Sequence, residues 1–258
     1  MLSKISIITP SFNQGKFLER TILSVLNQNY PNLEYIIIDG GSNDSSVEII
    51  KKYGKEVTYW ISEQDRGQSS AINKGFIKAN GDYIGWLNSD DELNENALNI
   101  LGKVILENKI RGITKDLYYG ILQLIDENGN HVKIEPFNER LNFKDHLYAK
   151  APCLQPGSFY SKGALIKAGY LNENLHFCMD WDLWLRILKI GEAQFIPHIM
   201  GKLRVHPEAK SSNKNISNLK ESYRVFISHG GSYFSKWFLK YTFYFIRYAL
   251  TGRVTKKR

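Results

Sequence analysis

The chain of 258 residues is long enough for one large α/β domain or for a domain with an appendage, and its 43% hydrophobic content is typical of a globular protein. Its formal charge of +8 is unevenly distributed, because residues 1–201 hold 21 basic against 24 acidic side chains whereas residues 202–258 hold 13 against 2. A main body without a cationic excess argues against nonspecific nucleic-acid binding.

The cysteines and the apolar runs of the sequence indicate the cellular compartment of the protein. Cys153 and Cys178 form neither a disulfide framework nor a metal-spaced cluster, which fits a reducing cytoplasm. No signal peptide is expected, since the first short apolar run ends at Pro10. Without an uncharged stretch of about 18 residues, the sequence predicts no conventional spanning helix.

Strands and helices are predicted to alternate through the first hundred residues. The β-rich runs are 5–9, 33–38, 57–61 and 83–87, and the helical patterns between them are 16–28, a segment around 47–50, and 68–79. Short helical crossovers imply a doubly wound, parallel sheet. The first turn, Thr9 to Gly15, lacks the Gly-x-Gly-x-x-Gly pattern, so a dinucleotide-binding dehydrogenase loses its main support.

An acidic motif, Asn88-Ser89-Asp90-Asp91, ends the fourth predicted strand. Open α/β sheets bind ligands where strands end, and oxygen ligands at that edge suit Mg²⁺ or Mn²⁺ holding a diphosphate. The alternative is that these residues only make a turn or a cap before the helix predicted over 95–106, which Asn94 could start.

Four segments in a fixed order resemble family 2 glycosyltransferases: Ile5 to Asn13, Ile36 to Ser42, Asp65 to Gly75, and the acidic motif. The resemblance covers roughly residues 4–206. It implies an inverting enzyme with the GT-A fold, an α/β fold whose mostly parallel sheet binds a nucleotide sugar. We therefore expect a catalytic domain over 1–206, with a nucleotide-sugar half over 1–91 and an acceptor half over 92–206, then a basic loop over 207–232 and a C-terminal helix over 233–258.

The resemblance also implies roles in binding the donor, usually a UDP-sugar. Thr9 and Pro10 would touch the base through the backbone, Phe12 would lie against it, and Asp39 would accept from the uracil N3–H. Turn chemistry before two glycines is the alternative for Asp39. Arg66 would reach the diphosphate, although a solvated surface cation is equally consistent with its loop.

The metal site is likewise implied by the resemblance. Asn88 replaces the first carboxylate of the family's commoner Asp-x-Asp, so Asp90 would be the principal ligand of Mn²⁺ or Mg²⁺, with Asp91 as a ligand or a close neighbour. His206 would close over the metal and Lys210 would contact the phosphates; the alternative for His206 is a purely structural role.

The general base is expected in the second half of the chain. Residues 178–186 resemble the family segment that carries the base of the single-displacement reaction, and Asp180 takes its place. The alternative is that Asp180 only caps a helix over 181–190. Gln155 matches a segment before the acceptor helix and is a candidate sugar contact.

The C-terminal helix is predicted to be amphipathic. Its cations Lys236, Lys240 and Arg247 share one arc, and aromatic residues occupy the opposite side: Phe234, Trp237, Phe238, Tyr241, Phe245 and Tyr248. This pattern favours an interfacial helix on an anionic membrane. Packing of the aromatic face on the catalytic domain, or on a second subunit in a homo-oligomer, is the alternative.

The sequence thus predicts a cytoplasmic, peripherally membrane-associated, metal-dependent inverting glycosyltransferase. It would move a sugar from a nucleoside diphosphate, most simply UDP, to a glycan or glycolipid hydroxyl in surface polysaccharide biosynthesis. Two rivals remain open. A nucleotidyltransferase would need a glycine-rich, basic phosphate loop that Pro10 to Gly15 does not provide, and a non-catalytic scaffold would have no need to retain Asp90 and Asp180.

Overall fold

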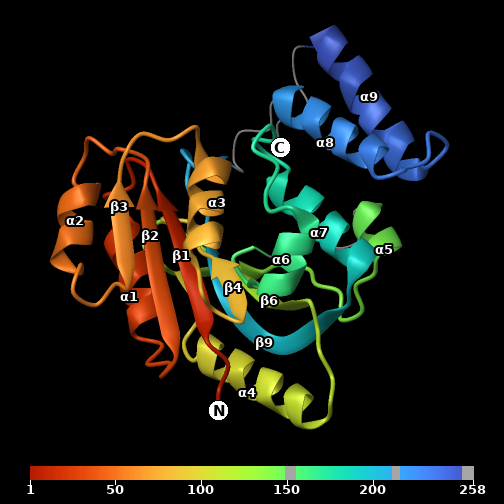
Figure 1. Ribbon diagram of the computed structural model, residues 1–258. Coiled ribbons are helices and arrows are strands. Elements are labelled where there is room, and N and C mark those ends of the chain that lie inside the picture. Colours follow the sequence, from red (N-terminus) through yellow and green to blue (C-terminus); the bar gives the residue numbers. More distant parts are fainter. Residues whose placement is uncertain (149–154, 211–215, 252–258) are drawn as a thin grey trace.

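The computed structural model describes residues 1–148, 155–210 and 216–251. Its first half is a parallel βα array, with the strands in the order β3-β2-β1-β4 (Figure 1). The strand bounds are β1 Ile5–Ser11, β2 Leu33–Asp39, β3 Tyr59–Ser62 and β4 Tyr83–Trp86. The crossover helices are α1 Leu18–Leu26, α2 Ser46–Lys52 and α3 Gln68–Lys78. The predicted elements of this half are confirmed.

The sheet continues beyond β4 with mixed strand directions. β8 (Ser158–Ser161) runs antiparallel to both β4 and β6 (Leu117–Ile125), and β6 pairs in parallel with the long, curved β9 (Ala193–Arg204). The short strands β5 (Glu92–Leu93) and β7 (His131–Ile134) pair with β9 and β6. The helices in this second part of the fold are α4 Ala97–Ile110, α5 Phe143–Leu147, α6 Lys162–Ala168 and α7 Met179–Ile190.

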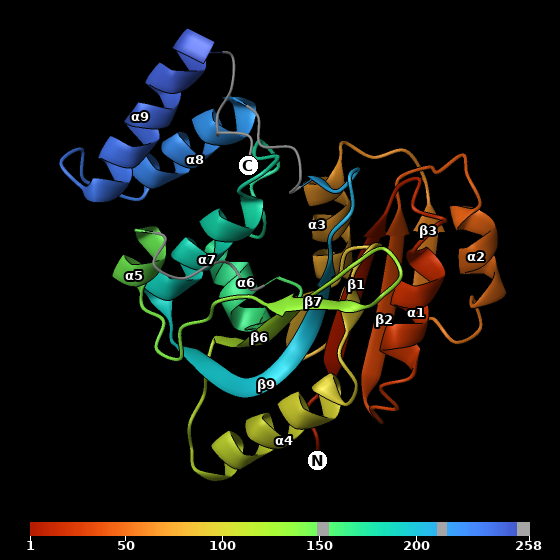
Figure 2. The same cartoon turned by 180° about the vertical axis from the view of Figure 1, so that it is seen from behind.

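Two apolar layers cover the sheet, because successive side chains of a strand point to opposite faces. On β1, Ile8 packs with residues of α3 and α7, while Ile5 and Ile7 pack with residues of α1 and α4. Figures 1 and 2 show these helices on opposite sides of the sheet. Burial on both faces explains the near-continuous apolar runs of the first strands. The predicted α/β fold class is confirmed.

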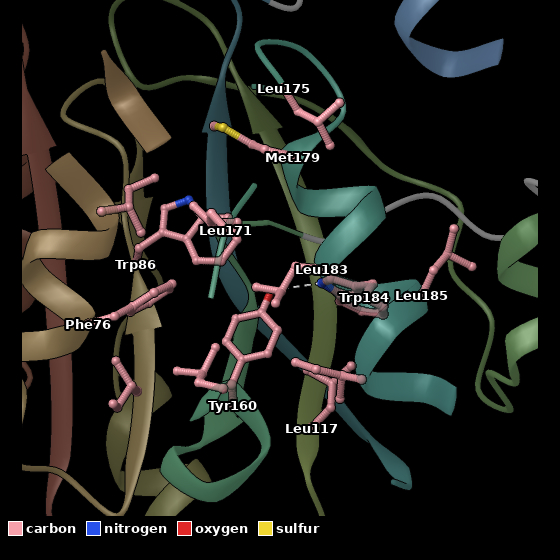
Figure 3. Packing of buried hydrophobic residues seen from close by; sticks show 14 of the residues in the cluster. Phe76, Trp86, Leu117, Tyr160, Leu171, Leu175, Met179, Leu183, Trp184 and Leu185 are labelled. Atoms are coloured by element: carbon pink, nitrogen blue, oxygen red, sulfur yellow. Dashed lines mark hydrogen bonds between the residues drawn. The ribbon is translucent and has the colours of Figure 1, made fainter. Parts of the chain in front are cut away.

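An aromatic stack joins the two halves beneath the strand ends. Trp86 of β4 and Tyr160 of β8 are stacked with ring centres 5.6 Å apart, and the Tyr160 hydroxyl accepts from Nε1 of Trp184 on α7 at 2.8 Å (Figure 3). All three side chains are almost completely buried. The hydrogen bond satisfies the polar tips of the rings, so α7 is held at a fixed position relative to the end of β4.

The C-terminal region corrects one prediction. The expected loop over 207–232 contains helix α8, Ile216–Ser228. Its Leu219, Val225 and Phe226 are buried, and the latter two belong to the core that includes α7. The polar, glycine-containing sequence reads as a loop, but packing of this apolar face stabilises a helix.

Helix α9, Lys236–Thr251, packs part of the predicted aromatic face on protein, which is the stated alternative for this helix, whereas Phe234 precedes α9 and is 95% exposed. Trp237 is 7% exposed and stacks between Phe226 and Tyr241, with ring centres 4.0 and 3.7 Å away, and it lies 5.8 Å from Trp181 of α7. Figure 1 shows α9 lying against α8 beside the start of α7. Removal of these large rings from water makes α9 part of the folded body.

A different face of α9 is apolar and open. Leu239, Phe243, Ile246 and Leu250 are 61%, 58%, 55% and 80% exposed, and they follow one another at helical spacing. We call these four residues the exposed stripe. Within the described ranges, none of the helices is both long and apolar enough to cross a bilayer.

Candidate active site

One large cleft lies at the carboxyl ends of the parallel strands, where ligands of open α/β sheets bind. Its volume is about 1230 Å³. Residues that follow β1, β2, β3 and β4 line one end, and residues of α7, α8 and α9 line the other. The cleft therefore spans both predicted halves and extends to α8 and α9, which lie beyond the catalytic domain expected over 1–206.

The acidic motif is held in a fixed shape at the floor of the cleft. Asp91 is 1% exposed, and its carboxylate accepts from the backbone N–H of Arg204 at 2.9 Å and from Nδ2 of Asn88 at 3.1 Å. Burial, followed by the neighbouring Asp90, raises the pKa of Asp91 well above its usual range. Its protein contacts make Asp91 a residue that orients Asn88 and the end of β9.

Arg204 is a residue that the sequence reasoning missed. Its side chain is buried, and its guanidinium donates to the backbone carbonyls of Asp90 at 2.8 Å and Asp126 at 3.0 Å and pairs with Glu92. A buried cation with several fixed acceptors rigidifies its surroundings. Its place in an alternating strand ending at His206 was the available signal; its partners, more than 70 residues away, were not visible.

Asp90 and His206 come together as predicted. Nε2 of His206 lies 3.1 Å from Oδ2 of Asp90, and the histidine ring is 4.8 Å from that of Phe17. The Asp90 side chain keeps 21% exposure toward the cleft, whereas that of His206 keeps 2%. A carboxylate oxygen and an imidazole nitrogen at this spacing are a chemically suitable pair of ligands for Mn²⁺.

A complete protein cage for a metal is not formed. Across the residues whose positions are given, no three His, Cys, Asp or Glu side chains are arranged around one metal position. A site of this kind fits a divalent ion that takes its remaining ligands from substrate phosphates and water, as Mg²⁺ commonly does. The predicted cofactor is compatible with Asp90 and His206, while Asp91 is engaged by the protein.

The nucleotide end contains some of the predicted contacts. Pro10 and Phe12 line the cleft, and Phe12 is 60% exposed, so its ring is free to lie against a base. Thr9 does not line the cleft: it is fully buried and its Oγ1 lies 3.0 Å from the hydroxyl of Tyr35. Any base contact from Thr9 remains a prediction about its backbone.

Asp39 is buried and anchors the turn that follows β2. Its Oδ2 accepts from the backbone N–H groups of Gly41 and Ser42 and from the Ser62 hydroxyl, and its Oδ1 accepts from the Ser42 hydroxyl at 2.6 Å. This is the turn chemistry offered as the alternative role. The predicted contact with a uracil N3–H would fall to Oδ1, which has the fewer partners, and stays a prediction.

Arg66 points away from the predicted diphosphate position. Its side chain is 82% exposed and pairs with Glu173 at 2.8 Å, and it does not line the cleft, although Asp65 and Gly67 on either side do. The predicted phosphate contact would require a different side-chain conformation. An exposed ion pair of this kind costs little to break.

Lys210 and Asn88 are connected through Gln68, the first residue of α3. Gln68 donates from Nε2 to Oδ1 of Asn88 at 2.8 Å and accepts at Oε1 from Nζ of Lys210, also at 2.8 Å. All three residues line the cleft. Gln68 lies within the Asp65 to Gly75 segment, for which the sequence predicts no role at this position, and it orients two predicted substrate contacts.

Asp180 reaches the cleft from α7, a different element from the one that carries the acidic motif. Helix α7 begins at Met179 with Cys178 as its N-cap, so the alternative that Asp180 caps the helix is wrong. Asp180 lines the cleft and is half-buried, and Oδ1 accepts from the N–H of Trp181 at 2.8 Å. Burial raises the pKa of Asp180, partly offset by the Trp181 N–H and by the charge of Lys210. Such a carboxylate is a stronger base than an exposed one.

Glu221 of α8 fixes the loop that leads into α7. Its carboxylate accepts from three consecutive backbone N–H groups, those of His176 at 2.9 Å and of Phe177 and Cys178 at 2.6 Å each. Glu221 is 9% exposed. Charge-assisted hydrogen bonds at a helix N-terminus are favourable, so this contact holds the helix that carries Asp180.

Gln155 lies between the two ends of the cleft. It lines the cleft at 8% exposure, and its Nε2 donates to the backbone carbonyl of Trp86. Its Oε1 has no hydrogen-bond partner among the described residues. A buried acceptor without a partner is costly, which fits the predicted contact with a substrate hydroxyl.

The chain is similar to known proteins both in sequence and in fold. The profile of Glycosyl transferase family 2 matches residues 6–165. An uncharacterised glycosyltransferase of Rickettsia felis is 32% identical over 233 residues, which cover 86% of this chain and 37% of the relative. A GalNAc(5)-diNAcBac-PP-undecaprenol beta-1,3-glucosyltransferase of Campylobacter jejuni is 27% identical over 240 residues, covering 88% and 72%. This chain thus spans little more than a third of the R. felis relative.

Solved structures share the fold. S. aureus TarS 1–349 in complex with UDP-GlcNAc superposes with a TM-score of 0.73 at 18% identity, covering 97% of this chain and 76% of TarS 1–349. The mannosyltransferase PcManGT of Pyrobaculum calidifontis, in complex with GDP-Man and Mn²⁺, superposes with a TM-score of 0.65 at 14% identity, covering 88% and 64%. The family profile covers most of the chain, including the acidic motif, and the chain belongs to Glycosyl transferase family 2.

Proposed function

We propose that the protein is an inverting glycosyltransferase that moves a sugar from UDP to a hydroxyl of a glycan or glycolipid acceptor in surface polysaccharide biosynthesis. The observation that carries the proposal is that Asp180 and Asp90 line the same cleft from separate elements, one on α7 and one after β4. Solved relatives in complex with UDP-GlcNAc and with GDP-Man and Mn²⁺ support a nucleotide-sugar donor in this fold.

The donor would lie across the strand ends. Phe12 would pack on the base, and the amide of Asn88, held between Gln68 and Asp91, would meet the ribose. Lys210 would contact the diphosphate from the side of α7, since it lines the cleft and is held by Gln68. These fixed contacts would orient the anomeric carbon toward Asp180.

Transfer requires one general base. Asp180 would accept the proton of the acceptor hydroxyl as the new glycosidic bond forms and the sugar–phosphate bond breaks, which inverts the anomeric centre. In this proposal Asp180 acts in its carboxylate form, which the nearby cation of Lys210 favours. A divalent ion held by Asp90 and His206 would neutralise charge on the departing diphosphate.

The decisive experiment is a nucleotide-sugar screen. Full-length protein with Mn²⁺ would be tested against UDP-, GDP- and dTDP-sugars by thermal shift, followed by donor hydrolysis with water as acceptor. We expect a UDP-sugar to raise the Tm and to be hydrolysed, and Asp180→Asn to keep the shift while losing hydrolysis. Binding without turnover in both proteins would instead favour the scaffold alternative.

We also propose that the protein works at the cytoplasmic face of an anionic membrane. The exposed stripe of α9 lies beside Lys236 and Lys240, both exposed, and an apolar face edged by cations suits an anionic interface. The test is sedimentation with vesicles of phosphatidylglycerol and phosphatidylcholine. Leu239→Ser with Phe243→Ser should abolish co-sedimentation; unchanged binding would assign the stripe to a homo-oligomer contact or to no partner.

A further inference from the structure

The cleft has an end that the donor does not need. A nucleotide sugar fits the part lined by the residues after β1, β2 and β4, but the lining continues past Asp180 to Lys240, Tyr241 and Tyr244 of α9. Small-molecule sites commonly occupy about 300–1,000 Å³, whereas this cleft measures about 1230 Å³. The cleft is larger than that range, and the residues of α7 and α9 that line it are not used by the proposed donor contacts.

This end combines aromatic faces with cations. Nζ of Lys240 lies 5.9 Å from the centre of the Tyr244 ring, and the rings of Tyr241 and Tyr244 are 6.1 Å apart. Near Asp180, the proposed general base, Nζ of Lys210 lies 5.9 Å from the centre of the Phe177 ring. Aromatic surfaces accommodate sugar rings, while lysines bind phosphate.

Helix α9 presents three surfaces in a fixed order around its axis. At about 100° per residue, the exposed stripe comes first, Lys236 and Lys240 come next, and Tyr244 and Tyr241 face the cleft. The surfaces are contiguous, since the ring of Phe243 in the exposed stripe lies 6.2 Å from that of Tyr244. From the outside of the molecule toward the cleft, the surface of α9 is therefore first apolar, then cationic and then aromatic. The proposed base, Asp180, lines the same cleft.

We propose that the acceptor is a saccharide linked through a diphosphate to a lipid, and that it enters along α9. Its apolar chain would lie on the exposed stripe, its diphosphate at Lys240, and its sugar over Tyr244 with a hydroxyl directed to Asp180. This inference rests on the proposed function. A lipid-linked diphosphate saccharide has the same three parts in the same order as the helix surface, whereas a free glycan has neither a tail nor an anion for the outer two.

The test uses decyl diphosphate below its micellar concentration as a probe of the outer two parts. Full-length protein is first saturated with UDP and Mn²⁺, so that the donor diphosphate position is filled, and the probe is then titrated by calorimetry. We expect binding that survives saturation with UDP. Lys240→Ala should weaken it about tenfold, the scale for losing one charge-assisted contact, and Lys240→Glu should weaken it further.

Two controls separate the outcomes. Lys220→Ala removes an exposed cation of α8 outside the cleft and should leave probe binding unchanged. Decyl maltoside, which has the tail but no anion, should bind at least tenfold more weakly than the diphosphate. Equal binding of both probes would show an unspecific apolar surface and would overturn the proposal.

The result also distinguishes this proposal from the donor assignment. If UDP competes with decyl diphosphate, the probe occupies the donor end and α9 holds no acceptor diphosphate, although the glycosyltransferase assignment stands. If UDP itself does not bind in the presence of Mn²⁺, the proposed function fails first. UDP affinity should be the same in Lys240→Ala and in the unsubstituted protein.

Discussion

The carboxylate of Glu221 accepts the backbone N–H of Cys178 at 2.6 Å, two residues before Asp180. The two groups come from α8 and from the N-cap position of α7, 43 residues apart in the chain. A helix outside the region matched by the family profile thus fixes the start of the helix that carries the proposed base. Substitutions at position 221 should consequently act on both stability and catalysis.

The first prediction concerns Glu221→Gln. Loss of the charge-assisted hydrogen bonds should destabilise the protein by about 2 kcal/mol and lower the Tm by about 5 °C. Because the charge of Glu221 also raises the pKa of Asp180, the acidic limb of the kcat/KM profile should move to lower pH. Glu107→Gln, at an exposed position of α4, is the control. A lower Tm with an unmoved pH profile would reduce Glu221 to a structural contact.

The second prediction concerns Asp90→Ala. Removal of the half-buried carboxylate beside His206 should weaken Mn²⁺-dependent UDP binding at least tenfold, while the Tm without ligand stays within a few degrees. Calorimetry with UDP, with and without Mn²⁺, measures the difference. Glu48→Ala on α2 serves as the matched loss of an acidic side chain. Unchanged Mn²⁺-dependent affinity would remove Asp90 from the metal site.

The third prediction concerns Asp180→Asn. Turnover should fall by about 10² or more, the usual scale for a general base, with UDP affinity retained. Since burial raises the folded-state pKa of Asp180, the unfolded chain releases this proton more readily. The free energy of unfolding therefore decreases as the pH rises from the pKa of Asp180 in the unfolded chain to its pKa in the folded protein. The decrease remains at higher pH. Asp180→Asn should accordingly show a Tm at pH 7 that is equal to or higher than that of the unsubstituted protein.

The pH dependence of the unsubstituted protein offers a companion measurement. Activity should be lost as the pH falls through the raised pKa of Asp180, so the acidic limb of kcat/KM should lie above the ordinary range of an aspartate. Lys210, beside Asp180, has a pKa lowered by burial, which places the basic limit of the profile below that of an exposed lysine. An acidic limb in the ordinary aspartate range would contradict the assignment.

The fourth prediction separates the two faces of α9. Trp237→Ala removes a ring that stacks on Phe226 and Tyr241, and it should cost about 3–5 kcal/mol. Phe243→Ala, on the exposed stripe of the same helix, should change stability by less than about 0.5 kcal/mol. Urea unfolding of both variants provides the comparison. Equal effects would mean that α9 does not pack on α8 as described.

The sequence predicted the parallel half of the fold well because each of its elements has a strong local pattern. The run Ile5 to Thr9 ends at proline, and residues 68–79 show helical spacing, so neighbouring residues determine the outcome. The donor loops follow from that order, since the carboxyl ends of parallel strands meet at one edge. Phe12, Asn88 and Asp90 therefore lie in the cleft as expected.

The missed features depend on contacts between distant residues. Helix α8 has a polar sequence, and its helical state is stabilised where Val225 and Phe226 pack in the core that includes α7. Arg204 and Glu221 have partners more than 40 residues away, so local patterns could not predict their roles. The predicted aromatic residues from Trp237 to Tyr248 lie on one face of α9, whereas Phe234 precedes the helix, and a periodic pattern does not distinguish lipid from protein as the partner of that face.

The Glu221 contact also determines what is needed to transfer α8 and α9 to a related enzyme. Its three donors are main-chain N–H groups, which every residue except proline provides. A graft of α8 and α9 onto a relative therefore needs the glutamate, a loop of matching backbone geometry, and at position 178 a side chain that accommodates Ser222 of α8, whose hydroxyl lies 3.2 Å from Sγ of Cys178. Chimeras built in this way could exchange acceptor preference while the nucleotide-binding half of the host is left untouched.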